Sequence, residues 1–176
     1  MKKIIMGVAV VALLSMASPA VATAPDWVLP IKSATPGSTN PKVTQANIQN
    51  TICKSGFTDT IRPPVSYTNK LKTTELTGSY KSFVATWGGA LGGYELDHLI
   101  SLQLGGNPTD VKNLWVEPYA GNGARKKDVV ETALKRLVCS GKITLIAAQT
   151  AISTNWVKAY NTYVTPADVA SSSSNG

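Results

Sequence analysis

The spacing of apolar and polar residues predicts two short strands in the middle of the chain. The run YELDHLISLQL, residues 94–104, has strand-like apolar positions at Tyr94, Leu96, Leu99, Ile100, Leu102 and Leu104. The Gly-Gly-Asn-Pro stretch at 105–108 ends this run, because glycine and proline interrupt regular structure. A second short run, NLWVEP, stops at Pro118. The pattern therefore predicts two strands joined by a glycine-containing loop.

Helical spacing precedes and follows these strands. The segment from Ala124, ARKKDVVETALKRLVCSG, has one apolar stripe and a natural stop at Gly141. The same spacing recurs over residues 144–164. Before the strands, one short helix is predicted with Thr44 as its N-cap and Gly56 just beyond its end, and a second is predicted with Ser66 as its cap. This order predicts a small α+β fold, with a single domain over residues 44–164.

The two ends of the chain differ in composition from this domain. Residues 1–22 contain two lysines, an apolar stretch and Ala20-Val21-Ala22, a pattern typical of a cleaved secretory signal peptide. We therefore expect an exported protein, secreted or periplasmic, with no membrane contact after cleavage. Residues 23–43 hold four prolines and predict an extended, poorly ordered lead-in. Residues 165–176 are small and polar and predict a disordered tail.

Charge and cysteine content give weaker indications, about binding partners and about a disulfide. The 17 basic and 10 acidic residues give a net charge of +7, which becomes +5 without Lys2 and Lys3. A basic balance favours polyanionic partners but identifies none. The two cysteines, Cys53 and Cys139, predict one disulfide in an oxidising compartment. The alternative is a pair of metal ligands, which the lack of a C-x-x-C motif and of a second histidine disfavours.

The candidate chemistry centres on His98, the one histidine of the chain, which directly follows Asp97. Hydrolysis of a phosphodiester needs an activated water, a cation that neutralises phosphate charge, and donors that hold the substrate. A neutral imidazole suits the removal of a proton from water near neutral pH. A carboxylate suits a hard cation such as Mg²⁺. Three basic residues near a helix N-terminus could bind phosphate: Arg125, Lys126 and Lys127.

These elements, in this order, resemble a known family. Asp97-His98, Gly105-Gly106, Asn113-Leu114 and the basic helix from Ala124 resemble the HNH (His-Me finger, ββα-metal) endonucleases over residues 94–139. The segments TICKSGF, IRPP and NLWVEP are also similar to a group of small exported bacterial proteins described as HNH-like. The resemblance implies a ββα-metal core with flanking helices.

The resemblance also implies a role for each matching residue. His98 would be the general base and Asp97 a metal ligand. Asn113 would orient the histidine and shape the loop. The third position, usually a metal ligand, would be Asn122, with Asp128 and Glu131 as alternatives.

One geometric condition follows from strand alternation. Adjacent residues of a regular strand point to opposite faces, so Asp97 and His98 diverge unless the strand ends or twists there. Glu95 and Asp97 share a face, and this carboxylate pair is a rival metal arrangement.

Together these features predict a secreted, monomeric, metal-dependent nuclease that acts on nucleic acid, with DNA favoured as the substrate and RNA as the alternative. Mg²⁺ is the expected metal, with Mn²⁺, Ni²⁺ or Zn²⁺ as alternatives. Two other classes stay open: a catalytically inactive protein of the same fold that binds nucleic acid or another polyanion, and a structural exported domain. Structural roles also stay open for His98 as a polar strand end, for Asn113 as a turn cap and for the three basic residues as a solvated face.

Overall fold

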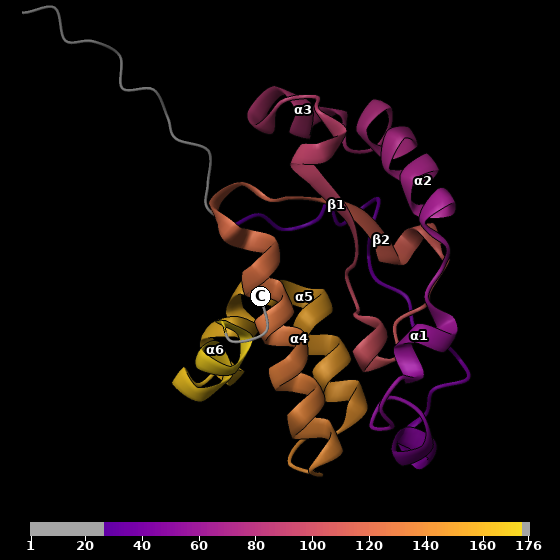
Figure 1. Cartoon of the computed structure of the whole chain (residues 1–176), viewed down its shortest axis with the longest axis vertical. Helices are drawn as coiled ribbons and strands as arrows, with labels where there is room; N and C mark the ends of the chain where they lie inside the picture. The colour runs from indigo at the N-terminus through magenta and orange to yellow at the C-terminus, as the bar shows by residue number, and fades with distance from the viewer. Residues whose placement is uncertain (1–26, 174–176) are drawn as a thin grey trace, which may run out of the picture.

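A two-stranded antiparallel sheet and the helix after it form the centre of the molecule. The computed structural model describes residues 27–173. β1 (Tyr94–His98) pairs with β2 (Leu114–Pro118), and in this register Glu95 lies opposite Glu117. α4 (Gly123–Cys139) follows directly, so the chain forms a β1–β2–α4 unit (Figure 1). The predicted α+β class is confirmed.

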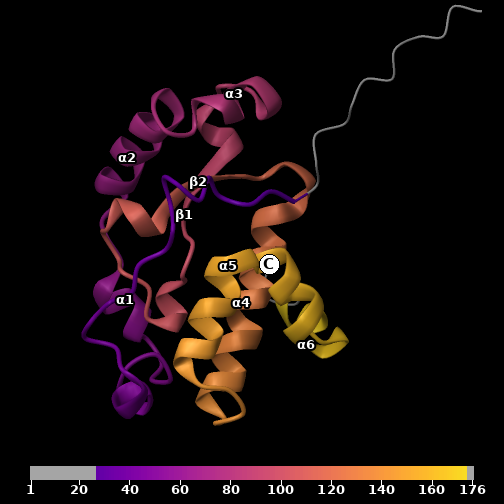
Figure 2. The same cartoon turned by 180° about the vertical axis from the view of Figure 1, so that it is seen from behind.

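Helices lie on both sides of this unit. α5 (Leu145–Tyr163) packs along α4, and α6 (Pro166–Ser173) also contacts α4. α1 (Phe57–Ile61), α2 (Val65–Thr77) and α3 (Lys81–Trp87) precede the sheet, and α2 contacts both strands. Figures 1 and 2 place α2 and α3 at one end of the molecule and α4 and α5 towards the other, with the sheet between them. Short 3₁₀ helices connect these elements at Gln45–Asn50, Leu91–Gly93, Leu102–Leu104, Val111–Asn113 and Ala120–Asn122.

Two clusters of buried apolar side chains hold the helices against the sheet. The first lies between α4, α5 and the N-terminal segment and includes Ile52, Leu134 and Trp156. The second lies between α2, α3 and the sheet and includes Tyr80 and Trp115. Full burial of one large apolar side chain contributes about 1.5–3 kcal/mol, so each cluster is a substantial source of stability.

β1 ends at His98, six residues before the predicted end of the run at Leu104. The strand ends there because Asn113 binds the two residues that follow it. The Leu99 amide donates to the Asn113 carbonyl at 2.8 Å, and the Asn113 side chain forms hydrogen bonds with the backbone of Ile100. The chain then leaves the sheet and forms the 3₁₀ helix at residues 102–104. The strand end at His98 releases this side chain from the strict alternation of a regular strand.

Some predicted helix boundaries are corrected. Thr44 is the N-cap of a helix, as predicted, but this helix is the 3₁₀ turn Gln45–Asn50. Gly56 does not follow its end; it precedes α1 with a left-handed φ of 76°. α2 begins before Ser66 and has Pro64 at its N-cap position, where the fixed φ of proline suits a helix start.

The described part of the lead-in, residues 27–43, is extended but packed, which corrects the predicted lack of order. The Thr35 hydroxyl donates to the Leu114 carbonyl at 3.1 Å, and the Asn40 amide donates to the Gly105 carbonyl at 2.8 Å. These bonds attach the segment to β2 and to the glycine loop. The predicted signal peptide, residues 1–22, lies outside the described residues.

The predicted disordered tail is also corrected, because residues 166–173 form α6. The Asp168 carboxylate accepts hydrogen bonds from the Arg136 guanidinium at 3.0 Å and from the Thr165 hydroxyl at 2.7 Å. The small polar composition of the segment gave no sign of this partner on α4.

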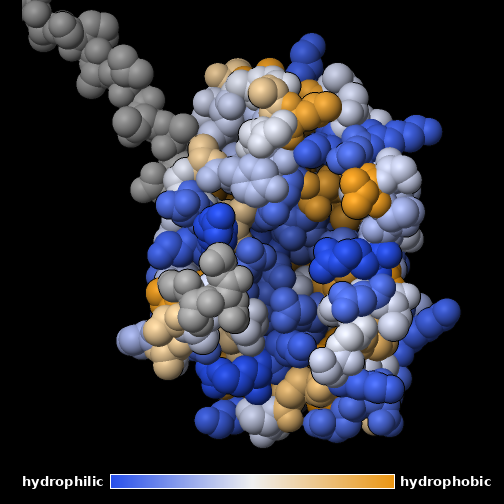
Figure 3. Space-filling model, viewed as in Figure 1, coloured by the Kyte–Doolittle hydropathy of each residue, from blue (hydrophilic) through white to orange (hydrophobic). Residues whose placement is uncertain are grey.

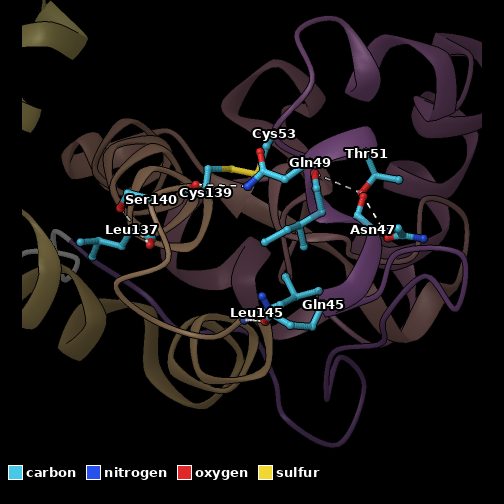
Figure 4. The surroundings of a disulfide bond; sticks show 10 residues. Gln45, Asn47, Gln49, Thr51, Cys53, Leu137, Cys139, Ser140 and Leu145 are labelled. Atoms are coloured by element: carbon cyan, nitrogen blue, oxygen red, sulfur yellow. Dashed lines mark hydrogen bonds between the residues drawn. A yellow bond between two sulfur atoms is a disulfide. The ribbon is translucent and has the colours of Figure 1, made fainter.

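The predicted disulfide between Cys53 and Cys139 is confirmed, with Cα atoms 5.6 Å apart. Figure 4 shows that it joins the N-terminal segment to the last residue of α4. Gln49 lies beside it and donates to the Cys139 carbonyl at 3.3 Å, while the Gln45 side chain accepts from the Leu145 amide at 2.6 Å. Among residues 27–173, no helix has the length and apolar character needed to cross a bilayer.

Candidate functional site

His98 lies at the end of β1 and is 7% exposed. Its Nε2 is 3.0 Å from the carbonyl oxygen of Pro108. A carbonyl only accepts hydrogen bonds, so Nε2 carries the proton and donates it, which assigns the tautomer of the neutral ring. The Nδ1 lone pair is then open, and within the described part of the chain Nδ1 has no hydrogen-bond partner.

Asn113 builds the loop that presents Pro108 to the histidine. It is fully buried, and its amide nitrogen donates to the carbonyls of Ile100 and Asn107, at 3.0 Å each. Its side-chain oxygen accepts from the amide of Ile100 at 2.9 Å. None of these hydrogen bonds involves the His98 side chain. Asn113 instead fixes the loop whose Pro108 carbonyl binds the ring.

Gly106 allows the close approach within this loop. A Cβ at this position would lie 1.6 Å from the Ile100 carbonyl oxygen and 2.8 Å from the Asn113 amide nitrogen. No side chain fits there, so the residue must be glycine for the loop to close around Asn113.

A polar cavity of about 170 Å³ lies beside His98. Its charged lining comes from three elements: β1, α4 and the end of α1. The middle of this face, over α4, is hollowed and hydrophilic (Figure 3). The ionisable residues of the lining are Arg62, Glu95, Asp97, His98, Asp128 and Glu131.

Lys127 is the buried cation of the site. It is 1% exposed, and its ammonium lies 2.6 Å from Asp97 Oδ2, 2.6 Å from Glu131 Oε1 and 2.9 Å from the His98 carbonyl oxygen. The three acceptors match the three protons of the ammonium. Burial alone would lower the pKa of Lys127, but the carboxylates of Asp97, Glu131 and Glu117 outweigh it and raise the pKa.

These contacts correct the prediction that Lys127 binds phosphate. The ammonium is enclosed and already holds its full set of acceptors, so it is not accessible to a substrate in this conformation. Helical spacing could have indicated this, since Lys127 lies three and seven residues before Val130 and Leu134, on the buried stripe of α4.

Only some of the other predicted site residues line the cavity. Arg125 is exposed on the first turn of α4, and Lys126 is half-buried with its ammonium 5.4 Å from the ring centroid of Tyr160. Asn122 is exposed at the N-cap position of α4 with a left-handed φ of 60°, and it is not among the residues that line the cavity. Of the residues considered for the third metal position, Asp128 and Glu131 do line it.

Three carboxylates could hold a metal ion. One oxygen each from Glu95, Asp97 and Glu117 lies within 4.8 Å of the other two. This group contains both residues of the rival Glu95–Asp97 pair, whereas Asn122 of the predicted Asp97–Asn122 pair is not part of it. Oxygen ligands of this kind suit hard cations.

Burial and mutual repulsion set the protonation of these groups. Burial, with the charges of Asp97 and Asp128, raises the pKa of Glu95 to about 7. Burial and Asp97 hold the pKa of Glu117 well above its usual range. Burial also raises the pKa of Glu131 to about 7, although Lys127 opposes this. Burial lowers the pKa of His98, more than Asp97 and the Pro108 carbonyl raise it, so its ring is neutral near pH 7.

Sequence reasoning did not find Arg62 or Glu117. Arg62 follows α1 and reaches the cavity only through tertiary packing, for which the sequence has no local signal. Glu117 could have been found from the sequence, because the pairing of the two predicted strands places it on the same face as Glu95 and Asp97.

Comparison of the chain with protein-family models, with curated proteins and with solved structures finds no match.

Proposed function

We propose that this protein is a divalent-cation-dependent phosphodiester hydrolase that acts on nucleic acid, with His98 as the general base. The observation that carries the proposal is the state of the His98 ring. The Pro108 carbonyl fixes the proton on Nε2, and burial lowers the pKa, so Nδ1 offers a lone pair at neutral pH.

The surrounding residues support this chemistry. His98 would accept the proton of the attacking water on Nδ1, while Lys127 holds the His98 carbonyl and so fixes the end of β1. Arg62 lies at the cavity and would bind a phosphate oxygen of the substrate. Arg125 and Lys126, beside the start of α4, would hold neighbouring phosphates. A bound divalent cation would neutralise charge that develops on the phosphate.

Export and the nature of the substrate belong to the same proposal. The Cys53–Cys139 disulfide supports a compartment in which disulfides persist, as the N-terminal sequence suggests. The resemblance over residues 94–139 supports DNA as the substrate, with Mg²⁺ as the cation.

A second function has one observation in its favour. Lys127 occupies Asp97 Oδ2, and Asn122 lies apart from the cavity lining, so the two predicted metal ligands do not meet there. A protein of this fold that binds a polyanion without cleaving it would need neither ligand.

The test compares wild-type protein with His98→Ala on supercoiled plasmid in the presence of Mg²⁺. Loss of the base should lower the cleavage rate by about 10²–10⁴-fold, because general-base catalysis contributes that much. Circular dichroism checks that the variant is folded. Equal rates for the two proteins would remove His98 from the mechanism, and plasmid retention without cleavage would favour the binding protein.

A matched pair of arginine and lysine variants tests substrate contact. Arg62→Ala should raise KM more than it lowers kcat, because a phosphate contact made in both ground and transition states changes binding uniformly. Lys142→Ala is the control, since this exposed lysine follows the opposite end of α4 from the cavity. A change in KM shared by both variants would show a general charge effect instead.

A further inference from the structure

Glu117 is a buried carboxyl group that makes no hydrogen bond in the described part of the chain. It is 1% exposed, and among the described residues neither of its carboxylate oxygens has a hydrogen-bond partner. A buried carboxyl group without a hydrogen bond is costly, because its oxygens have lost their hydration without gaining a donor. Such a group in a well-packed strand calls for an explanation.

The strand register adds a second unfavourable feature. Glu117 lies directly opposite Glu95 in the antiparallel pair, and like charges in directly opposed positions destabilise a sheet. Asp97 lies two residues further along the same face of β1. Three acidic side chains thus converge on one face of a two-stranded sheet.

Lys127 relieves this convergence only in part, because it makes no hydrogen bond to Glu117. Its ammonium already donates to Asp97 Oδ2, to Glu131 Oε1 and to the carbonyl of His98, so no proton is left for Glu117. Both Lys127 and the Trp115 indole bind Oδ2 of Asp97, which leaves Oδ1 without a hydrogen bond in the described part of the chain. The site therefore has carboxylate oxygens that no described side chain binds through a hydrogen bond.

The geometry points to a divalent-cation site formed by Glu95, Asp97 and Glu117. One oxygen from each residue lies within 4.8 Å of the others. Opposite oxygen ligands are separated by about 4.2 Å around Mg²⁺ and by about 4.6–5.2 Å around Ca²⁺, so the three oxygens can share one hard cation. Glu95 and Asp97 also line the polar cavity, so two of the three ligands can be reached from it.

This site extends the rival Glu95–Asp97 pair by Glu117 and does not include Asn122, the ligand that the resemblance implied. Its use in hydrolysis rests on the proposed function. Cation binding itself does not, since the register, the burial and the unpartnered oxygens are independent of any reaction.

The test is binding of Mn²⁺ to the purified full-length protein, measured from the loss of the electron paramagnetic resonance signal of free Mn²⁺. Wild-type protein should bind one Mn²⁺ per chain. Glu117→Gln should weaken binding at least tenfold, because it removes one charged ligand. The amide is close in shape to the buried side chain, so this variant should fold. Asp59→Asn, which removes an exposed carboxylate from α1, is the control and should bind as wild type does.

The outcomes separate the site from the proposed function. Absence of Mn²⁺ binding at millimolar concentration, or equal affinity in wild type and Glu117→Gln, would overturn the site. Loss of Mn²⁺ binding in Glu117→Gln, with no effect of His98→Ala on plasmid cleavage, would support the site and overturn the general-base proposal.

Discussion

Lys126 and Lys127 are neighbours in the chain, but their ammonium groups meet opposite environments. Lys126 extends over the rings of Trp27 and Tyr160, at 5.9 and 5.4 Å from their centroids. Lys127 is enclosed and joins α4 to the end of β1 through Asp97 and the His98 carbonyl. A single residue thus connects the helix of the β1–β2–α4 unit to the strand that bears the histidine.

Replacing each lysine by methionine should reveal this difference. Lys127→Met leaves the partly buried carboxylate of Asp97 and the buried one of Glu131 without their counter-ion, a change that typically costs about 3–5 kcal/mol. Lys126→Met is the matched control and should cost less than about 1 kcal/mol, because a partly exposed cation contributes little. Urea denaturation followed by tryptophan fluorescence measures both values. Similar losses in the two variants would contradict the structural role of Lys127.

At the scale of elements, the sequence predicts what depends on local spacing. The apolar stripe predicted a helix from Ala124, and α4 begins one residue earlier. The end of β1 could not be predicted, because it depends on hydrogen bonds from Asn113 to a residue 13 positions away. The candidate site shows the same difference: residue type and order pointed to Asp97 and His98, which both line the cavity, whereas the approach of Arg62 depends on tertiary packing.

α6 shows the same dependence on a distant partner and gives a prediction with a defined pH dependence. Burial alone would raise the pKa of Asp168, but hydrogen bonds from Arg136 and Thr165 outweigh it, and the net pKa is lowered from 3.8. A lowered pKa means that the folded state favours the carboxylate. Its contribution to stability is therefore complete well above pH 3.8 and is lost as the pH falls below that value.

Asp168→Asn should accordingly be less stable than wild type at pH 7, by about 1 kcal/mol for a two-point contact with a half-exposed arginine. The difference should shrink as the pH falls below 3.8, because the wild-type carboxyl then becomes neutral too. Urea unfolding at a series of pH values measures it. Asp59→Asn on α1 serves as the control, and a difference that persists unchanged into acid would contradict the assignment to Asp168.

At the scale of the whole molecule, chain segments distant in sequence hold the site. The lead-in pairs with β2 and the glycine loop, and the disulfide attaches the N-terminal segment to the end of α4. The loop that the disulfide closes spans 86 residues and contains the sheet, the cavity and most of α4. The cross-link thus limits how far the unfolded chain can separate the elements that build the site.

Removal of this cross-link should destabilise the molecule as a whole. For a separation of 86 residues, the chain-entropy account gives about 4–5 kcal/mol, because the cross-link lowers the entropy of the unfolded chain. The double variant Cys53→Ser/Cys139→Ser should show a loss of this size in urea, and reduction of the wild type with dithiothreitol should lower its stability by a similar amount. Dithiothreitol should have no effect on the double variant, which controls for other actions of the reductant.

Thiol titration of the unfolded, unreduced wild type should find no free thiol. Two thiols per chain, or equal stability of the oxidised and double-serine proteins, would show that the bond does not stabilise the molecule.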